Sequence, residues 1–464
     1  MKDYDFAVIG GGSAGYSAAS TASSLGLSTV VIESGAELGG LCILRGCMPS
    51  KTFIESANRF LTLRRAAEFG LSAESIAFDP KLILNRKRRL VGDFARYRGE
   101  QLLDGRFDLI RGRASFLTPH RLRVAENTGE TRELEFRTSL VSTGSTVNLL
   151  DIPGLLETGF LDSDRALESA AVPPSVIILG GGAIALEFAH YYEALGSRVT
   201  IVQRSSQLLK EADPDVAQVV ADAYRARGIE VICGTRLVRV GRLGTDKTVT
   251  YIKGDEERTI AAAEIFYALG RRPQTKDLNL TAVGIETDKT GEILVNAALQ
   301  SSQPNIFGAG DVTGLQDVVH LAVEQGAVAA RNAVQHLRGG ELATLDYRLK
   351  MFAVFSHPEL ATIGLTEAEA HKRGQRIRCA KYPFADHGKS IVRGEIEGFV
   401  KLLADANTNE IIGGAVVGPE ASELIHEIAV AMYFHATGKD LAQIPHYHPT
   451  LSEIWTYPAE DLAS

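Results

Sequence analysis

The sequence predicts an α/β fold with two Rossmann-like dinucleotide-binding domains and a C-terminal α+β domain. Three observations predict this architecture: a glycine-rich strand–helix–strand pattern at the N-terminus, a second copy near residue 180, and a change to alternating strands after about residue 346. At 464 residues the chain is long enough for about two to four domains with sizeable cores.

The first pattern begins with a short apolar strand at residues 6–9, which a glycine-rich loop follows. A helix of small residues is expected over 16–26, and a strand over 28–33 ends in the acid Glu33. Such a loop lets the backbone approach a pyrophosphate at a helix N-terminus, and the acid binds a ribose hydroxyl. The residues of the fingerprint are Gly10, Gly12 and Gly15.

Two cysteines, Cys42 and Cys47, follow this unit at a spacing of five positions. In a regular α-helix such residues lie roughly 8–9 Å apart at Cα, whereas a disulfide needs less than about 7 Å. If the cysteines pair, the backbone between them must leave helical geometry, and Gly46 and Pro49 permit this. A strained dithiol loop beside a nucleotide site indicates redox chemistry. The alternatives are inert buried thiols or metal ligands, but no second cysteine pair exists to complete a zinc site.

The glycine-rich pattern recurs in the second part of the chain, with a strand at 175–179, a helix at 186–195 and a strand at 198–202. Gly10 to Glu33 and Gly180 to Gln203 both span 23 positions, so a neutral residue replaces the acid in the second copy. One glycine fingerprint is weak evidence, because many occur in ordinary tight turns, but two in context are strong. The second fingerprint consists of Gly180, Gly182 and Ala185.

The remaining segments complete these domains. A helical stretch is expected over 51–98, strands lead to 142–145, and the segments 268–273 and 305–311 are expected to return to the first fold. In the C-terminal part, a strand at 398–403 and a helix at 421–437 predict an antiparallel sheet with helices.

Composition excludes several classes of protein. The formal net charge of −8 argues against a nucleic-acid binder and gives no reason to expect attraction to an anionic membrane. No run approaches 18 apolar residues, and the N-terminus enters a strand at once, so neither a membrane span nor a signal peptide is expected. Four cysteines in a chain this long do not form an extracellular disulfide framework. We therefore expect a cytoplasmic protein, in which a disulfide is catalytic or redox-sensing.

Over essentially its whole length the chain resembles the class I pyridine nucleotide–disulfide oxidoreductases, flavoproteins related to dihydrolipoamide dehydrogenase and glutathione reductase. The resemblance is carried by the two nucleotide units, the dithiol loop, and the segments 308–311 and 446–453. It implies FAD in the first fold, NAD(P)(H) in the second, and a homodimer formed by the C-terminal domain. The implied boundaries are 1–147 for the first part of the FAD-binding domain, 148–270 for the NAD(P)-binding domain, 271–345 for the return segment of the FAD-binding domain and 346–464 for the dimerisation domain.

The resemblance also implies the roles of the redox residues. Cys47 would sit over the flavin as a charge-transfer thiolate, and Cys42 would be the outer thiol that forms a mixed disulfide with substrate. His448 would act as general acid–base toward the dithiol of the other subunit, with Glu453 fixing its tautomer. Two alternatives stay open for His448: a histidine that only caps a helix beginning near Pro449, or a metal site shared with His446.

Further residues follow from the same resemblance. Lys51 and Glu187 would form an ion pair beside the flavin N5, and Asp311 would accept a hydrogen bond from the FAD ribityl chain. The segment 320–325, beginning with His320, would direct a helix N-terminus at the flavin pyrimidine. Thr143 and Gly144 would add to the FAD site, and Gly270 to the NAD(P) site. No metal site is expected, and structural roles are expected for the two other thiols, Cys233 and Cys379.

The choice of nicotinamide depends on the end of the second unit's second strand. Gln203 is neutral, and Arg204 and Lys210 follow it, which favours the 2′-phosphate of NADP(H) over NAD(H) by a small margin. The alternative is that both cations are merely solvated.

The substrate is expected to be a dithiol. The segments 49–51, 355–359 and 446–453 look most like those of dihydrolipoamide dehydrogenases, although Leu41 and Leu44 replace the family's usual Thr and Asn. We expect dihydrolipoamide, or a lipoyl domain, to reduce the Cys42–Cys47 disulfide. Two alternatives remain: an NADPH-dependent reductase of a low-molecular-weight disulfide, like glutathione reductase, and a redox-sensing or lipoyl-protein-docking flavoprotein with little turnover.

Overall fold

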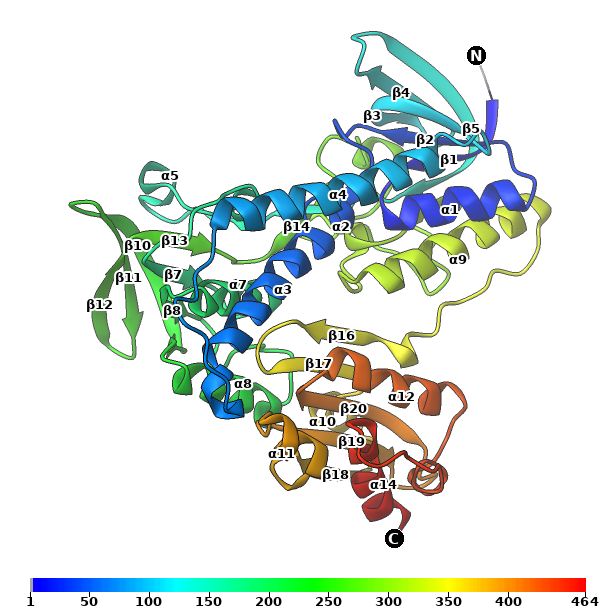
Figure 1. The fold of residues 1–464 in the computed structure, drawn as a ribbon. Helices are drawn as coiled ribbons and strands as arrows, with labels where there is room; N and C mark the ends of the chain where they lie inside the picture. Colours follow the sequence, from blue (N-terminus) through cyan, green and yellow to red (C-terminus); the bar gives the residue numbers. More distant parts are fainter. Residues whose placement is uncertain (1–2) are drawn as a thin grey trace. The chain divides into compact units, whose positions relative to one another are not determined.

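The structure, a computed structural model, describes residues 3–464 and divides into two compact units (Figure 1). Unit 1 comprises Met1–Thr52, Leu82–Leu149 and Gly270–Leu345, and unit 2 comprises Phe53–Lys81, Leu150–Leu269 and Asp346–Ser464. Unit 2 therefore holds both the second predicted nucleotide-binding domain and the predicted C-terminal domain. The domain boundaries given above stay a prediction.

Unit 1 is built around a six-stranded sheet in the order β1-β2-β3-β4-β5-β15, in which β1 also pairs with β5. The pairs β1–β2, β2–β3, β1–β5 and β5–β15 are parallel, whereas β3–β4 and β4–β5 are antiparallel. The strands are β1 (Asp3–Ile9), β2 (Thr29–Glu33), β3 (Asp108–Thr118), β4 (Arg121–Glu126), β5 (Thr131–Val141) and β15 (Ile306–Gly308). The pairing of β15 with β5 confirms that the segment around residue 307 returns to the first sheet.

Helices α1 (Ser13–Ser24) and α9 (Val319–Arg338) pack side by side in unit 1 (Figure 1). Small residues allow this close approach, because a Cβ at Gly326 of α9 would lie 2.1 Å from the backbone oxygen of Ala14. The second half of β1, residues 6–9, is apolar on both faces and buried, which is typical of a strand in a parallel arrangement. A separate antiparallel pair joins β6 (Ser145–Val147) and β14 (Arg271–Pro273).

Between β2 and β3 the chain forms the helices α2 (Gly40–Leu44), α3 (Cys47–Arg64) and α4 (Pro80–Leu102). The helical stretch predicted over 51–98 is therefore interrupted. After the short η1 (Ala66–Phe69), Gly70 adopts φ +71°, a left-handed conformation that ends a helix.

The nucleotide-binding part of unit 2 is a parallel sheet in the order β13-β7-β8-β9. Its elements are β7 (Ser175–Leu179), α7 (Ala183–Ala194), β8 (Arg198–Val202), α8 (Pro214–Ala226), β9 (Glu230–Ile232) and β13 (Glu264–Tyr267). This confirms the second predicted strand–helix–strand unit. An antiparallel sheet of β10 (Thr235–Leu243), β11 (Asp246–Lys253) and β12 (Glu256–Ala262) is inserted between β9 and β13, and the short helices α5 (Leu155–Thr158) and α6 (Ser163–Leu167) precede β7.

The C-terminal part of unit 2 is an antiparallel sheet in the order β16-β17-β20-β19-β18, as predicted. Its strands are β16 (Met351–Val354), β17 (Glu359–Gly364), β18 (Ile377–Pro383), β19 (Phe399–Asp405) and β20 (Ile411–Gly418). Its helices are α10 (Glu367–Lys372), α11 (Gly388–Arg393), α12 (Ala421–Tyr433), α13 (Gly438–Ala442) and α14 (Thr456–Ala463). The core contains the fully buried Trp455, and α12 ends before the predicted residue 437, because His435 adopts φ +56°.

None of the helices formed by residues 3–464 is both long enough and apolar enough to cross a membrane.

Candidate functional site

The first glycine loop, in unit 1, is shaped for close approach of the backbone. Gly10 has φ +103°, and a Cβ there would lie 2.5 Å from the backbone oxygen of Ser142. A Cβ at Gly15 would lie 1.8 Å from the backbone oxygen of Gly10. Gly12 is the N-cap of α1 and presents no side chain, so the first-turn N–H groups of α1 are open to a ligand.

Glu33 stands at the end of β2 and faces this loop. Its Oε2 accepts a hydrogen bond from the Gly11 amide at 2.7 Å, and its Oε1 accepts one from the Gly35 amide at 2.6 Å. The carboxylate is therefore held beside the loop by backbone donors. Its predicted role toward a ribose stays a prediction.

The second glycine loop, in unit 2, repeats this geometry. A Cβ at Gly180, which has φ +115°, would lie 2.4 Å from the backbone oxygen of Ala268. A Cβ at Gly181 would lie 3.0 Å from Cδ of Gln203, just as one at Gly11 would lie 3.3 Å from Oε2 of Glu33. The two loops differ at their third fingerprint position, where the second loop has the fully buried Ala185 in place of Gly15. Gly182 is the N-cap of α7, and Gly270 adopts φ +110°.

The predicted cationic pair of the second loop is only partly available. Arg204 is exposed and makes no ion pair with any residue of the range 3–464, whereas Lys210 pairs with Glu211 at 2.9 Å. Arg204 is thus the cation that remains open to a phosphate.

Asp311 follows β15 and belongs to a polar cluster in unit 1. Its Oδ2 accepts a hydrogen bond from the Ser145 hydroxyl at 2.5 Å, and the same hydroxyl accepts one from Nε of Arg271 at 2.8 Å. Thr143 donates to the backbone oxygen of Gln274 at 2.7 Å. Gly144 adopts φ +70°, and His320 is the exposed second residue of α9.

The dithiol loop leaves helical geometry between its cysteines, as predicted. Helix α2 ends after Leu44, Arg45 adopts φ −143°, and α3 begins at Cys47. A Cβ at Gly46 would lie 3.0 Å from the backbone oxygen of Leu41, so glycine is needed here for close approach. Pro49 lies in the first turn of α3, where a missing N–H has no helical partner to lose.

This loop contacts the first glycine loop directly. Gly40, the first residue of α2, has φ +71°, and a Cβ there would lie only 2.6 Å from Cα of Gly12. No side chain separates the two backbones at this point. The sequence order "nucleotide loop, then dithiol" thus becomes a spatial contact within unit 1.

The surroundings of the two thiols differ in a way that suits exchange chemistry. Both cysteines are half-buried free thiols. The pKa of Cys42 is raised, first by its hydrogen bond to Cys47 and then by burial, while the charge of Lys51 opposes the rise. Cys47 is the first residue of an 18-residue helix, whose dipole favours a thiolate. The geometry therefore favours a proton on Cys42 and negative charge on Cys47.

The two remaining cysteines are less suited to such chemistry. Burial raises the pKa of Cys233, which follows β9, and raises that of Cys379, on β18, to about 11. Neither stands at the start of a helix.

In unit 2 the structure brings His448 and Glu453 together. Nδ1 of His448 lies 2.9 Å from Oε2 and 3.2 Å from Oε1 of Glu453. Because carboxylate oxygens only accept, the tautomer with the proton on Nδ1 fits, and Nε2 is left as the basic nitrogen. The His448 side chain is 78% exposed and that of Glu453 only 11%, so a fixed carboxylate orients an accessible imidazole.

The structure gives less support to the two alternatives for His448, a helix-capping role and a metal site shared with His446. The nearest helical segment, η6 (Ser452–Trp455), begins three residues beyond Pro449, so a helix-capping role is wrong. His446 contacts a different carboxylate, because its Nε2 lies 2.6 Å from Oε1 of Glu427.

One residue that the sequence did not point to belongs to this group. His387, fully buried before α11, has its Nε2 3.4 Å from Oε1 of Glu453. No local motif surrounds it, so only the folded chain reveals the contact.

Lys51 and Glu187 belong to different units, and their pairing stays a prediction. Glu187 is buried on α7, and its Oε1 accepts a hydrogen bond from the Phe355 amide at 3.2 Å. Lys51 is half-buried on α3, and its Nζ lies 3.3 Å from Oγ of Ser50.

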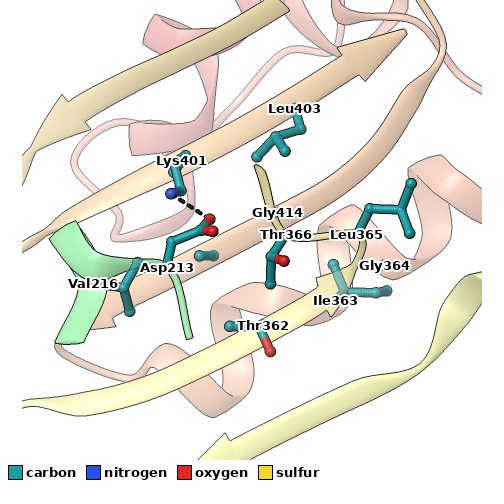
Figure 2. Close-up of a pocket in the computed structure, with 11 residues that line it drawn as sticks. Asp213, Val216, Thr362, Ile363, Gly364, Leu365, Thr366, Lys401, Leu403 and Gly414 are labelled. Atoms are coloured by element: carbon teal, nitrogen blue, oxygen red, sulfur yellow. Dashed lines mark hydrogen bonds and ion pairs between the residues drawn. The ribbon is translucent and has the colours of Figure 1, made fainter. Parts of the chain in front are cut away.

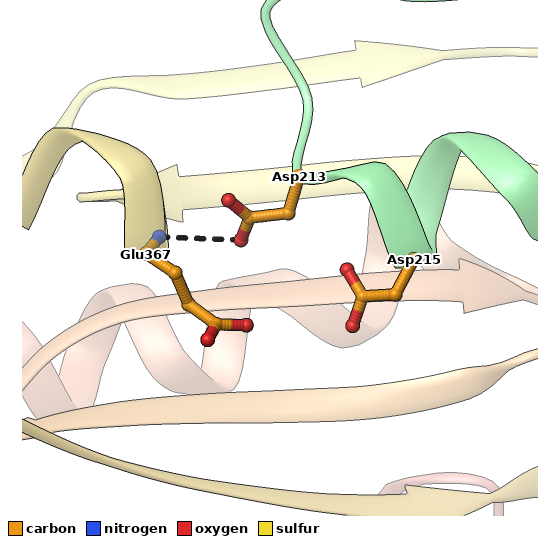
Figure 3. Close-up of side chains that lie close together, drawn as sticks. All are labelled: Asp213, Asp215 and Glu367. Carbon is orange, nitrogen blue, oxygen red and sulfur yellow. Dashed lines mark hydrogen bonds between the residues drawn. The ribbon is translucent and has the colours of Figure 1, made fainter. Parts of the chain in front are cut away.

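Unit 2 also contains an acidic cluster with the ligand types of a metal site, Asp213, Asp215 and Glu367 (Figure 3). The ammonium group of Lys401 already lies among these carboxylates, 2.7, 3.0 and 2.9 Å from the three residues in that order. Figure 2 shows its contact with Asp213. Burial alone would lower the pKa of Lys401, but its hydrogen bonds to Asp213 and Glu367 outweigh burial and raise it. A protonated lysine thus takes the place of a metal ion.

Comparison with known proteins gives concordant matches. Residues 4–326 match the family model described as pyridine nucleotide-disulphide oxidoreductase, and residues 352–459 match that family's dimerisation domain. A dihydrolipoyl dehydrogenase of Thermus scotoductus is 35% identical over 475 residues, covering 100% of this chain and 98% of its own. A mercuric reductase of Staphylococcus aureus is 32% identical, covering 95% and 79%. The crystal structure of LpdA from Mycobacterium tuberculosis superimposes with a TM-score of 0.88 at 30% identity, covering 100% of both chains.

Proposed function

The chain belongs to the pyridine nucleotide-disulphide oxidoreductase family, and we propose that it oxidises a dithiol substrate through Cys42 and Cys47, with FAD and a nicotinamide nucleotide as cofactors. The observation that carries this proposal is the contact of Gly40 with Gly12, which joins the dithiol loop to the first nucleotide loop. A structural disulfide or a zinc site would need no such contact.

The residues of unit 1 fit FAD. A Cβ at the first or last glycine of the loop from Gly10 to Gly15 would clash with backbone oxygens, so the loop keeps its tight turn, and it leads into the N-terminus of α1, which suits a diphosphate. Glu33 is placed for a ribose hydroxyl, and Asp311 for the ribityl chain. When bound, FAD would supply the carrier of an electron pair between the dithiol and the nicotinamide.

For the nicotinamide nucleotide we propose a preference for NADP(H). Gln203 brings no negative charge to the position where Glu33 stands in unit 1, and Arg204 beside it has no carboxylate partner in the described chain. A dianionic 2′-phosphate gains more from such a cation than a ribose hydroxyl does. The pairing of Lys210 with Glu211 reduces its contribution.

The chemistry of the thiols follows from their surroundings. A substrate thiol passes its proton to Nε2 of His448, supplied by the partner subunit, and the resulting thiolate attacks Cys42 in the oxidised pair. The Cys42–Cys47 bond breaks, and Cys47 leaves as a thiolate that the α3 N-terminus stabilises. The second substrate thiol then releases its proton to solvent as it displaces Cys42, and Cys42 takes up the proton held by His448. The products are a substrate disulfide and a reduced cysteine pair.

We propose dihydrolipoamide as the dithiol, because relatives covering the whole chain are dihydrolipoyl dehydrogenases. A second candidate is the NADPH-dependent reduction of a low-molecular-weight disulfide, which the neutral Gln203 and open Arg204 favour. A redox-sensing or lipoyl-docking protein with little turnover is the third possibility.

A homodimer is part of the proposal, since residues 352–459 match the family's dimerisation domain. The dimerisation domain exposes a group of large apolar side chains on and after α12, which a second copy would cover. These are Val430, Tyr433, Phe434, Ile444 and Tyr447.

Turnover assays separate the three candidates. The FAD-loaded protein is assayed with dihydrolipoamide and each oxidised nucleotide, and with glutathione disulfide and each reduced nucleotide. Fast dihydrolipoamide oxidation supports the first candidate, fast glutathione disulfide reduction the second, and the absence of both contradicts the proposed catalytic function. The Cys379→Ser variant is the control, because this thiol lies on the antiparallel sheet of unit 2, away from the dithiol loop in the sequence, and should leave turnover unchanged.

A further inference from the structure

The carboxylate of Glu453 is shared by two imidazoles. His448 lies 2.9 Å from Oε2, and Nε2 of His387 lies 3.4 Å from Oε1. His387 is fully buried at the N-terminus of α11, and its Nδ1 lies 2.9 Å from the hydroxyl of Ser390 on that helix. This Nε2 makes no hydrogen bond of normal geometry within the described chain, so its 3.4 Å approach to Glu453 is a long electrostatic contact.

The partners of His387 decide its tautomer. The groups that raise the pKa of the ring are acceptors, the carboxylate of Glu453 and the backbone of Thr450, so Nε2, which faces Glu453, carries the proton and Nδ1 accepts a hydrogen bond from Ser390. The titratable groups that face the ring are Glu453, from η6, and His448, from the preceding loop. Burial lowers the pKa of His387, and Glu453 only partly opposes this, so the ring is neutral near pH 7.

His448 depends on this arrangement because little else holds it. Its ring is 78% exposed, and Glu453 is its hydrogen-bond partner among residues 3–464. A carboxylate without a second donor rotates about its terminal bond and releases an exposed imidazole into other rotamers. The buried imidazole of His387 faces the oxygen that is farther from His448, and so opposes that rotation.

We propose that His387 is a positioning residue for proton transfer: it fixes the Glu453 carboxylate, and through it the ring of His448. This inference rests on the proposed function, because it assigns His448 to dithiol chemistry. Nothing in the local sequence of His387 marks it, and its role arises only from the packing of α11 beside η6.

Two isosteres of histidine test the proposal. In His387→Gln the amide nitrogen reaches the place of Nε2 and can direct an N–H group at Glu453, whereas in His387→Asn it reaches only the place of Nδ1. We expect His387→Asn to lower kcat with the dithiol about tenfold, a fraction of what general acid–base catalysis contributes, and to shift the pH profile of kcat. The Gln variant should restore most of both, and the KM for the nucleotide should stay unchanged in both.

A second readout does not depend on turnover. In protein labelled with 13C-histidine, the pH titration of the His448 ring signal should move in His387→Asn and stay near that of the parent protein in His387→Gln. Melting temperatures within a few degrees of each other establish that both variants fold. Equal loss of kcat in both variants, or an unmoved ring signal in His387→Asn, overturns the positioning role. If the parent protein oxidises no dithiol but the ring signal moves as expected, the proposed function fails and the positioning role stands.

Discussion

Replacing Lys401 by methionine tests the account of the acidic cluster in unit 2. The Lys401 side chain is 0% exposed and contacts three carboxylates, of which that of Asp213 is 6% exposed. Asp213 stands at the N-cap of α8 but makes no capping hydrogen bond with its side chain, which is directed to Lys401 instead. Without the ammonium group, at least one buried carboxylate loses its cation.

The magnitude follows from burial. Removing one partner of a buried ion pair costs about 3–5 kcal/mol, because a charge is left uncompensated in the interior. Lys381 provides a matched control, since it also pairs with Asp215 but is 42% exposed, and surface pairs are worth under about 1 kcal/mol. Urea unfolding should therefore show a large loss of stability for Lys401→Met and a small one for Lys381→Met. Equal losses of stability in Lys401→Met and Lys381→Met would refute the reasoning. So would a divalent cation that stabilises the parent protein as much as it stabilises Lys401→Met, because the lysine would then not occupy the place of a cation.

The cluster also predicts a dependence of stability on pH. Burial alone would raise the pKa of Asp215, but hydrogen bonds from Lys381 and Lys401 lower it below its usual value near 3.8. The unfolded state therefore binds this proton more readily, so the contribution of Asp215 is present above pH 4 and is lost as the pH falls further. Urea midpoints measured between pH 3 and pH 6 should fall more steeply at the acid end in the parent protein than in Asp215→Asn.

Three further predictions concern the dithiol and the two nucleotide sites. Cys42→Ser should keep the long-wavelength absorbance of a thiolate beside flavin and lose dithiol turnover, whereas Cys47→Ser should lose both; the reverse pattern would exchange the roles of the two thiols. Gly40→Ala should weaken FAD binding, measured by flavin fluorescence, by about tenfold. The added methyl meets the nucleotide loop, and a left-handed residue other than glycine costs about 1–2 kcal/mol. The control is Gly70→Ala, which has the same φ of +71° but open space around it and should leave FAD binding unchanged. Arg204→Ala should raise the KM for NADPH about tenfold, which corresponds to the loss of one hydrogen bond to a charged group. The KM for NADH should stay unchanged. Equal increases in the KM for NADPH and for NADH would contradict a 2′-phosphate site.

Local signals in the sequence were sufficient for the elements around the two nucleotide loops. The equal spacing of 23 positions in the two units is matched by equivalent contacts in the structure, since Gln203 lies against Gly181 as Glu33 lies against Gly11. The break in the helix between the two cysteines also follows from local geometry, because no continuous helix brings such residues within disulfide distance.

Contacts between distant segments could not be predicted in this way. His387 meets Glu453, and Lys401 meets Asp213, only because strands and helices far apart in the chain pack together, and neither residue stands in a motif. The ion pair of Lys210 with the neighbouring Glu211 is likewise seen only in the structure, and the role of Lys210 toward a nucleotide stays a prediction. Whether an ionisable group is free for a ligand depends on such partners.

The central claim is that the Cys42–Cys47 pair exchanges electrons with a bound flavin, and anaerobic reduction of the FAD-loaded protein tests it most directly. On titration with NADPH or dithionite, the account predicts that the first electron pair produces a long-wavelength band while the flavin stays oxidised, and that full reduction of the flavin requires a second pair. Bleaching of the flavin by the first electron pair, with no such band, would contradict the claim.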